Sequence, residues 1–281
     1  MPADEDKYPT ESGRRRFVKG VVGSATLASV GTGAAAALGT ATSSSGAGGG
    51  ITQYMAIKNT DGPAPRGMPI IPLTIENGNE LKGVWPEVKE VTEGGRTVKV
   101  AETELGGITY SSEWFQYCGV QTYPGVRPGE DQDNFFRASS GDTYEWMSDI
   151  ETGEKLTVDM FDDYETWGNG IGKSGLGKPA MATWRSQDVE PQSTMPVQVL
   201  RSPRIEELAK ENEFYAAATQ DGFVAWLDKC THFCCVPGFK AYEGSAKFGA
   251  EDRVYCQCHQ SVYNPFSPKQ VSYVALPRPE E

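Results

Sequence analysis

Two short stretches near the C-terminus determine which fold and which chemistry the sequence supports. The first is Cys230-Thr231-His232-Phe233-Cys234-Cys235-Val236-Pro237, and the second is Cys256-Gln257-Cys258-His259-Gln260-Ser261-Val262-Tyr263. Together they contain five of the six cysteines and both histidines of the 281-residue chain. Any metal site that uses an imidazole ligand must therefore use one or both of these stretches.

Each stretch offers one cysteine and one histidine at close spacing: Cys230 with His232, and Cys256 with His259. Two thiolates and two imidazoles can bind a tetrahedral zinc ion, or a 2Fe-2S cluster with two cysteines on one iron and two histidines on the other. The two spacings fit the cluster, because each stretch then gives its cysteine to one iron and its histidine to the other. Zinc fingers usually pair like ligands within one loop, and a structural zinc site is the alternative.

A further cysteine in each stretch, Cys235 and Cys258, could join the two by a disulfide, which is chemically permitted outside the cytoplasm. The stretches resemble the Cys-Thr-His-x-Gly-Cys and Cys-x-Cys-His-x-Ser-x-Tyr loops of the Rieske iron-sulfur proteins of cytochrome bc complexes. The resemblance implies one 2Fe-2S cluster per chain, with the Cys235 and Cys258 disulfide bracing the loops. The ligands that it implies are Cys230 and Cys256 for the buried iron, and His232 and His259 for the outer iron.

Two hydroxyl groups of the second stretch belong to the same resemblance. Ser261 and Tyr263 fall where the family has hydroxyl donors to the cluster or to a cysteine sulfur, so both are expected to bind the cofactor. Such donors stabilise the reduced, more negative cluster and raise its potential. Their presence favours a high-potential Rieske centre over a ferredoxin-type centre.

Some positions depart from the family pattern. Cys234 and Gln260 stand where the family usually has glycine, so the backbone there must tolerate a side chain. Twenty residues separate Cys235 from Cys256, somewhat more than the family pattern predicts. The proline-containing segment 275–279 is the candidate for the loop that normally covers the cluster.

Two cysteines have no role in the resemblance. One is Cys234 in the first stretch, and the other is Cys118, far away in the sequence. They predict either a second disulfide that ties the region 51–150 to the first stretch, or two buried thiols that behave as small apolar residues. The sequence fixes no distance between them, so both interpretations stay open.

The resemblance predicts a mainly β fold: a Rieske-type antiparallel β-sandwich with a small cluster-binding subdomain. We assign residues 151–281 to this Rieske domain, with cluster loops at 230–237 and 256–263. Residues 51–150 are rich in glycine, proline and aromatic residues, and short extended runs at 96–100 and 108–110 predict strands there. This region is expected to be a β-rich extension of unknown role.

The sequence before the first stretch predicts its neighbouring elements. Residues 196–201 are expected to form a strand, and 203–214 a helix with its apolar residues at helical spacing. Residues 214–219 and 223–227 are expected to form two strands around a turn at 220–222. The second of these strands leads directly into the cysteines, which a metal site needs because its loop must be held by rigid elements.

The N-terminus predicts export. Residues 12–19 read Ser-Gly-Arg-Arg-Arg-Phe-Val-Lys and resemble a twin-arginine signal, so 1–19 is expected to be cytoplasmic. Residues 20–42 are a weakly apolar signal or transmembrane anchor; a helix over 21–42 would be about 33 Å long, enough to cross a hydrocarbon core of about 30 Å. Residues 43–50 are serine and glycine-rich and predict a flexible hinge. We expect an anchored protein of the plasma membrane whose body lies on the extracytoplasmic side.

The charge balance excludes one class of partner. The chain has 38 acidic and 26 basic residues and a formal net charge of -12. Nucleic-acid binding needs clustered cationic side chains, so we expect no nucleic-acid partner. The acidity is also typical of proteins adapted to high salt, where charge repulsion is screened, although an ordinary acidic exported protein has the same balance.

The resemblance implies an electron-transfer subunit of a quinol-cytochrome c reductase, which is not catalytic alone. His232 or His259 would hydrogen-bond quinol and take its proton while the cluster takes an electron. The expected partners are a cytochrome b-type membrane subunit, quinol, and a cytochrome c or small copper protein as acceptor. The alternatives are the small Rieske subunit of an exported oxidase such as arsenite oxidase, and a cytosolic oxygenase or ferredoxin, against which the export signal and the Cys235 and Cys258 pair argue.

Overall fold

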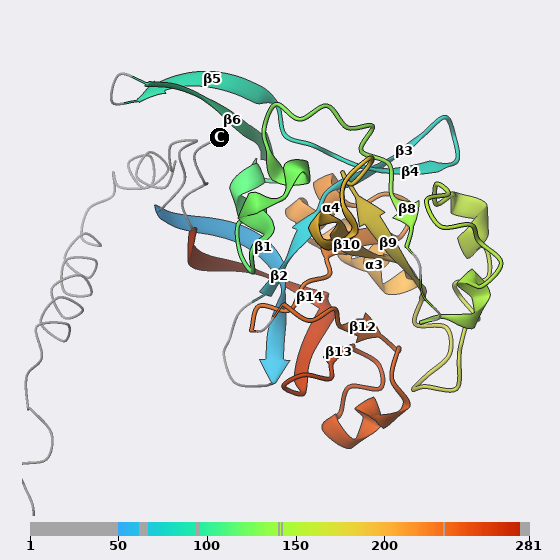
Figure 1. Cartoon of the computed structure of the whole chain (residues 1–281). Helices are drawn as coiled ribbons and strands as arrows, with labels where there is room; N and C mark the ends of the chain where they lie inside the picture. The colour runs from blue at the N-terminus through green and yellow to red at the C-terminus, as the bar shows by residue number, and fades with distance from the viewer. Residues whose placement is uncertain are drawn as a thin grey trace, which may run out of the picture. The chain divides into compact units, whose positions relative to one another are not determined.

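The computed structural model describes residues 50–61, 67–93, 96–139, 141, 143–232 and 234–275. Its largest element is a sheet of nine strands whose pairings are all antiparallel, in the order β12-β13-β14-β1-β2-β11-β10-β9-β8 (Figure 1). The strands of this sheet are β1 Gly50–Asp61, β2 Gly67–Ile71, β8 Arg137–Ala138, β9 Lys178–Trp184, β10 Met195–Arg201, β11 Phe223–Leu227, β12 Gly238–Phe239, β13 Val254–Cys256 and β14 Ser261–Ala275. The prediction of a mainly β protein with antiparallel sheets is confirmed.

The large sheet contains strands from both the predicted extension 51–150 and the predicted domain 151–281. Strand β2 pairs with β11, with Ile71 opposite Ala225 and Ile70 opposite Trp226. On its other side β2 pairs with β1, and β1 pairs with β14 over almost its whole length. The first strands of the extension are therefore the central strands between the two cysteine stretches.

Two smaller sheets belong to the extension. One is the hairpin β3 Leu73–Glu76 and β4 Glu80–Gly83, and the other contains β5 Val88–Glu93, β6 Arg96–Leu105 and β7 Ile108–Ser111. Figure 1 shows β5 and β6 as a long arm at the top of the view, while β12 and β13 lie at the bottom. The strands predicted at 96–100 and 108–110 are confirmed as parts of β6 and β7.

The remaining elements are helical. The α-helices among the described residues are α3 Pro203–Glu211 and α4 Glu213–Ala218. The short 3-10 helices are η1 Ser112–Phe115, η2 Val120–Thr122, η3 Pro124–Val126, η4 Glu145–Met147, η5 Val158–Phe161, η6 Pro191–Ser193 and η7 Glu243–Phe248. Among the described residues no helix is long and apolar enough to cross a membrane. The predicted twin-arginine region 1–19, the anchor 20–42 and all but the last residue of the hinge 43–50 lie outside the described residues.

The region before the first cysteine stretch folds as expected at its ends and differently in its middle. The strands predicted at 196–201 and 223–227 are confirmed as β10 and β11, and the turn at 220–222 joins Gln220 to Phe223 by a β-bridge. The strand predicted at 214–219 is wrong, because these residues lie mostly in α4. The reason is Asn212, whose side chain accepts a hydrogen bond from the Tyr215 amide and so caps a new helix.

The same residue explains why the helix predicted over 203–214 is shorter. Ser202 caps its start by accepting a hydrogen bond from the Arg204 amide, and Pro203 occupies the first turn, where its missing N–H costs nothing. Asn212 has extended backbone angles, so α3 ends at Glu211. The two short helices lie against the large sheet, where the Tyr215 hydroxyl donates to the Pro265 carbonyl of β14 at 2.7 Å.

The core lies around β11, whose five residues are all buried. Fully buried aromatic side chains from both parts of the sequence fill it, among them Trp114, Trp184, Trp226, Tyr110, Tyr215, Phe115 and Phe223. Burying such rings contributes about 1.5 to 3 kcal/mol each. Because β11 leads into the first cysteine stretch, a fully buried strand of the core positions that stretch.

Candidate metal centre

The first stretch forms a tight loop that starts where β11 ends. The amide of Asp228 donates to the Pro196 carbonyl at 2.8 Å, which fixes the end of the strand to β10. Within the loop, the Cys230 amide donates to the Cys235 carbonyl at 2.7 Å, and the Cys234 amide donates to the Cys230 carbonyl at 3.1 Å. These two hydrogen bonds close the loop on itself and turn the Cys230 side chain inward, where it is fully buried.

The second stretch is the hairpin between β13 and β14. Cys256 and Ser261 face each other as the last register pair, so residues 257–260 form the turn. Both paired residues are fully buried, whereas His259 in the turn is exposed. The hairpin thus places a cysteine in the interior and a histidine at the surface, as the Cys-x-x-His spacing allows.

The buried cysteines of the two loops meet. The Cys230 and Cys256 thiols lie close enough to shift each other's pKa, and the Tyr263 hydroxyl lies 3.2 Å from the Cys230 sulfur. His232, which is half-buried, points its Nδ1 atom to within 3.3 Å of the same sulfur. The rings of His232 and His259 have their centroids 6.2 Å apart. The structure therefore brings together the four residues proposed as ligands.

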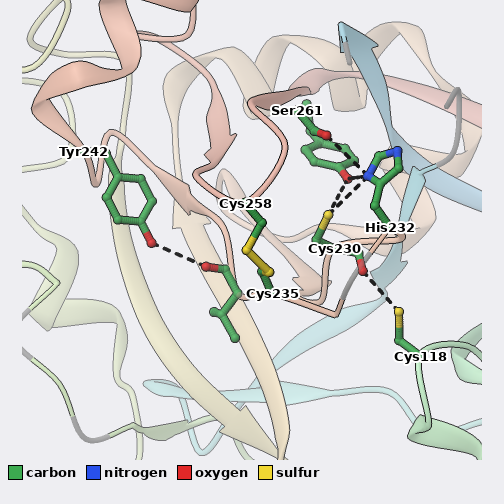
Figure 2. The surroundings of a disulfide bond; sticks show 9 residues. Cys118, Cys230, His232, Cys235, Tyr242, Cys258 and Ser261 are labelled. Atoms are coloured by element: carbon green, nitrogen blue, oxygen red, sulfur yellow. Dashed lines mark hydrogen bonds between the residues drawn. A yellow bond between two sulfur atoms is a disulfide. The ribbon is translucent and has the colours of Figure 1, made fainter. Parts of the chain in front are cut away.

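The two hydroxyl groups also face this point. Figure 2 shows the Ser261 hydroxyl directed at His232 Nδ1, at 3.3 Å, and the Tyr263 hydroxyl lies 3.4 Å from the same atom. Burial, followed by the hydrogen bond with Cys230, raises the pKa of Tyr263 above its ordinary value. Tyr263 consequently keeps its proton and can donate it to a sulfur.

The paired thiols have opposite acidities. The hydrogen bond from Cys256 lowers the pKa of Cys230 to about 4 against the effect of burial, with a smaller contribution from Tyr263. The same hydrogen bond, with burial, raises the pKa of Cys256. The buried pair therefore favours a thiolate on Cys230. Thiolate is the form of cysteine that binds metals.

A buried acid lies beside the first loop. Asp228 is fully buried two residues before Cys230, and burial raises its pKa well above the ordinary value. Its Oδ1 atom accepts a hydrogen bond from Trp226 Nε1 at 3.3 Å. Burial thus disfavours a negative charge on Asp228 beside the Cys230 sulfur. The sequence contains no signal for this, since its cause is burial.

A disulfide joins the two loops. It links Cys235 and Cys258, the pair that the resemblance implies, with their Cα atoms 6.7 Å apart (Figure 2). The sulfurs of Cys235, Cys256 and Cys258 lie within 4.8 Å of one another. Two of these three are bonded to each other and are not thiolate ligands. The available donors are the two buried thiols and the two imidazoles, a set that suits zinc or an iron-sulfur cluster.

Both positions at which the family usually has glycine adopt left-handed backbone angles. The φ angle is 60° at Cys234 and 58° at Gln260. L-residues other than glycine enter this region at a cost of about 1 kcal/mol or more. Both loops therefore require a left-handed backbone conformation, which glycine adopts most easily, at positions that Cys234 and Gln260 occupy.

A segment of the extension 51–150 forms hydrogen bonds with the residues that begin the first loop, and the sequence does not indicate this contact. The Tyr117 hydroxyl donates to the Lys229 carbonyl at 2.7 Å, and Lys229 Nζ donates to the Tyr123 hydroxyl at 2.5 Å. The Cys118 thiol donates to the Cys230 carbonyl at 3.2 Å. We call residues 116–123 the support segment. The only sequence signal for it was the unassigned Cys118.

Cys118 and Cys234 are both thiols and both half-buried. Burial is the main cause that raises the pKa of Cys118 to about 12, and the Cys234 side chain raises it further. Of the two interpretations that the sequence left open, the structure has two free thiols, which are half-buried rather than buried. The Cys118 thiol and the Cys234 amide both donate to the Cys230 carbonyl. The candidate cover loop 275–279 lies beyond the described residues except for Ala275, the end of β14.

Comparison of the chain with protein-family models, with curated proteins and with solved structures finds no significant match. The functional interpretation therefore depends on the two loops themselves.

Proposed function

We propose that this chain is the Rieske iron-sulfur subunit of a membrane quinol-oxidising cytochrome bc complex. The observation that carries the proposal is the geometry of two loops: each gives one buried cysteine and one more exposed histidine to a common point. A zinc finger has no need for this separation of thiols inside from imidazoles outside. A 2Fe-2S cluster that takes two thiolates on one iron and two imidazoles on the other would need it.

The residues that would hold the cluster are Cys230 and Cys256 on the inner side and His232 and His259 on the outer side. Bound there, a 2Fe-2S cluster supplies one-electron transfer. Tyr263 donates a hydrogen bond toward the Cys230 sulfur, which favours extra negative charge there and so favours the reduced state. The Cys235–Cys258 disulfide keeps the loops at a fixed separation.

The histidines are the catalytic residues in this proposal. His232 turns Nδ1 toward Cys230, so its Nε2 atom lies on the opposite side of the ring. His259 is exposed in the hairpin turn. An imidazole nitrogen directed outward can accept a hydrogen bond from a quinol hydroxyl and then take its proton, which couples proton release to electron transfer.

The wider architecture is part of the proposal. In this proposal the large sheet forms the Rieske-type β-sandwich. The small cluster-binding subdomain consists of β12, β13, η7 and the start of β14. The N-terminal signal would anchor the chain in the plasma membrane with its body outside the cytoplasm, beside a cytochrome b-type subunit. The electron would pass to a cytochrome c or to a small copper protein.

The experiment that tests the proposal measures iron, acid-labile sulfide and zinc in the purified full-length chain, with electron paramagnetic resonance after reduction. We expect equal amounts of iron and sulfide, and a mixed-ligand Rieske signal that is absent from Cys256→Ser. The Cys118→Ser variant is the matched control and keeps the signal. Zinc in place of iron would refute the cluster.

A second measurement tests the bc complex separately from the cluster. Isolated membranes are titrated with quinol while the reduced signal is recorded, with and without a quinol-site inhibitor. We expect the signal to shift with the inhibitor and the chain to co-purify with a cytochrome b. A Rieske signal that is indifferent to quinol would leave the cluster but reject the quinol-oxidising role.

A further inference from the structure

Cys118 and Cys234 meet at one carbonyl group. The Cys118 thiol and the Cys234 amide both donate to the Cys230 carbonyl, at 3.2 Å and 3.1 Å. The neighbouring Cys234 side chain also raises the pKa of the Cys118 thiol. The two residues come from segments more than 100 positions apart, yet both donate to the same carbonyl group.

Both cysteines also hold an unfavourable backbone conformation. The φ angle is 51° at Cys118 and 60° at Cys234, in the region where glycine is the favoured residue. A residue with a side chain persists there only when the surrounding structure holds it, and such positions gather at functional sites. The structure thus keeps two thiols side by side at two positions where glycine would be less strained.

We propose that Cys118 and Cys234 form a redox modification site that a disulfide oxidant converts to a second intramolecular disulfide. The Cys234 sulfur, as the thiolate, attacks a sulfur of the oxidant and releases one thiol, which leaves a mixed disulfide. The second cysteine then attacks the protein sulfur of that mixed disulfide and releases the other thiol. The oxidant gains two electrons and the two protons that the cysteines lose.

The site has the access and the consequence that this chemistry needs. Both cysteines are half-buried rather than fully enclosed, and the proposal requires that a small disulfide such as oxidised glutathione reach one of them. The product ties the support segment covalently to the first loop, where the present links are hydrogen bonds from Tyr117 and Cys118. The modification needs no bound cluster, so the outcome of its test does not depend on the proposed function.

Peptide mapping tests the proposal. The full-length chain is incubated with oxidised glutathione, alkylated, digested with trypsin and analysed by mass spectrometry without reduction. We expect the Cys118 peptide, residues 100–137, to be linked to the 230–240 peptide, and the link to be absent from Cys234→Ser. Alkylation of both cysteines after oxidation would overturn the proposal. So would a Cys118 link that persists in Cys234→Ser, since its partner would then be another cysteine.

Thermal unfolding gives an independent readout. The second disulfide closes a long loop of the unfolded chain, so oxidation should raise the unfolding midpoint by several degrees. The Cys118→Ser variant keeps a hydroxyl donor for the Cys230 carbonyl and should show no rise. An equal rise in this variant would overturn the proposal, because the effect would then come from elsewhere in the molecule.

Discussion

The two cysteine loops contain the same kinds of residue but are supported in different ways. The second loop is a hairpin whose position follows from the pairing of β13 with β14, and its turn 257–260 is exposed. The first loop leaves β11 and closes on itself, and its outer support is the segment 116–123, more than 100 residues earlier. A hairpin is local in sequence, whereas the first loop depends on long-range contacts.

This difference predicts where each loop is sensitive. A change in the second loop should act locally, because its ladder of hydrogen bonds remains when one side chain is altered. A change in the support segment should act on the first loop from a distance, because a buried carbonyl that loses its donor is costly. The disulfide is where the two kinds of support are joined.

The largest effect is expected from removing that disulfide. The Cys235→Ser/Cys258→Ser double variant loses the covalent link between the loops, and we expect the free energy of unfolding to fall by about 3 kcal/mol. Denaturant unfolding of the full-length chain measures it, and wild type treated with reductant serves as the comparison. An unchanged unfolding midpoint would mean that the hairpin and the support segment each hold their loop without help.

An intermediate effect is expected from Tyr117→Phe. The variant leaves the Lys229 carbonyl without its hydroxyl donor, which should cost about 1 to 2 kcal/mol of stability. The matched control is Tyr242→Phe, because the Tyr242 hydroxyl also donates to a carbonyl of the first loop, that of Val236, but at 3.4 Å and exposed to water (Figure 2). Thermal unfolding of both variants measures the difference. If both lose the same stability, the support segment has no special role.

The smallest effect is expected in the second loop, and it has the opposite sign. Gln260→Gly relieves the left-handed conformation at φ 58°, so the chain should gain about 0.5 to 1 kcal/mol. Gln257→Gly is the control in the same exposed turn, where φ is not positive, and it should lose about 0.5 kcal/mol or more. Denaturant unfolding that shows the same sign for both would contradict the strain interpretation.

Local signals predicted much of the structure. Short apolar runs identified β10 and β11, and the spacing of cysteines and histidines identified the two loops. The prediction failed at 214–219, where apolar residues suggested a strand and the cap at Asn212 produced a helix. The support segment could not be predicted, because nothing in its own residues shows that it will lie behind Lys229 and Cys230.

The pairing of β1 with β14 also has a mechanical consequence. Gly50 lies opposite Ala275 at one end of this ladder, while Asp61 lies opposite Val262 beside the cysteine loops at the other end. A force applied through the chain before Gly50 would peel the two strands apart pair by pair, starting far from the loops. Tension on the N-terminal side would therefore reach the cysteine loops only after the rest of the β1–β14 ladder had separated.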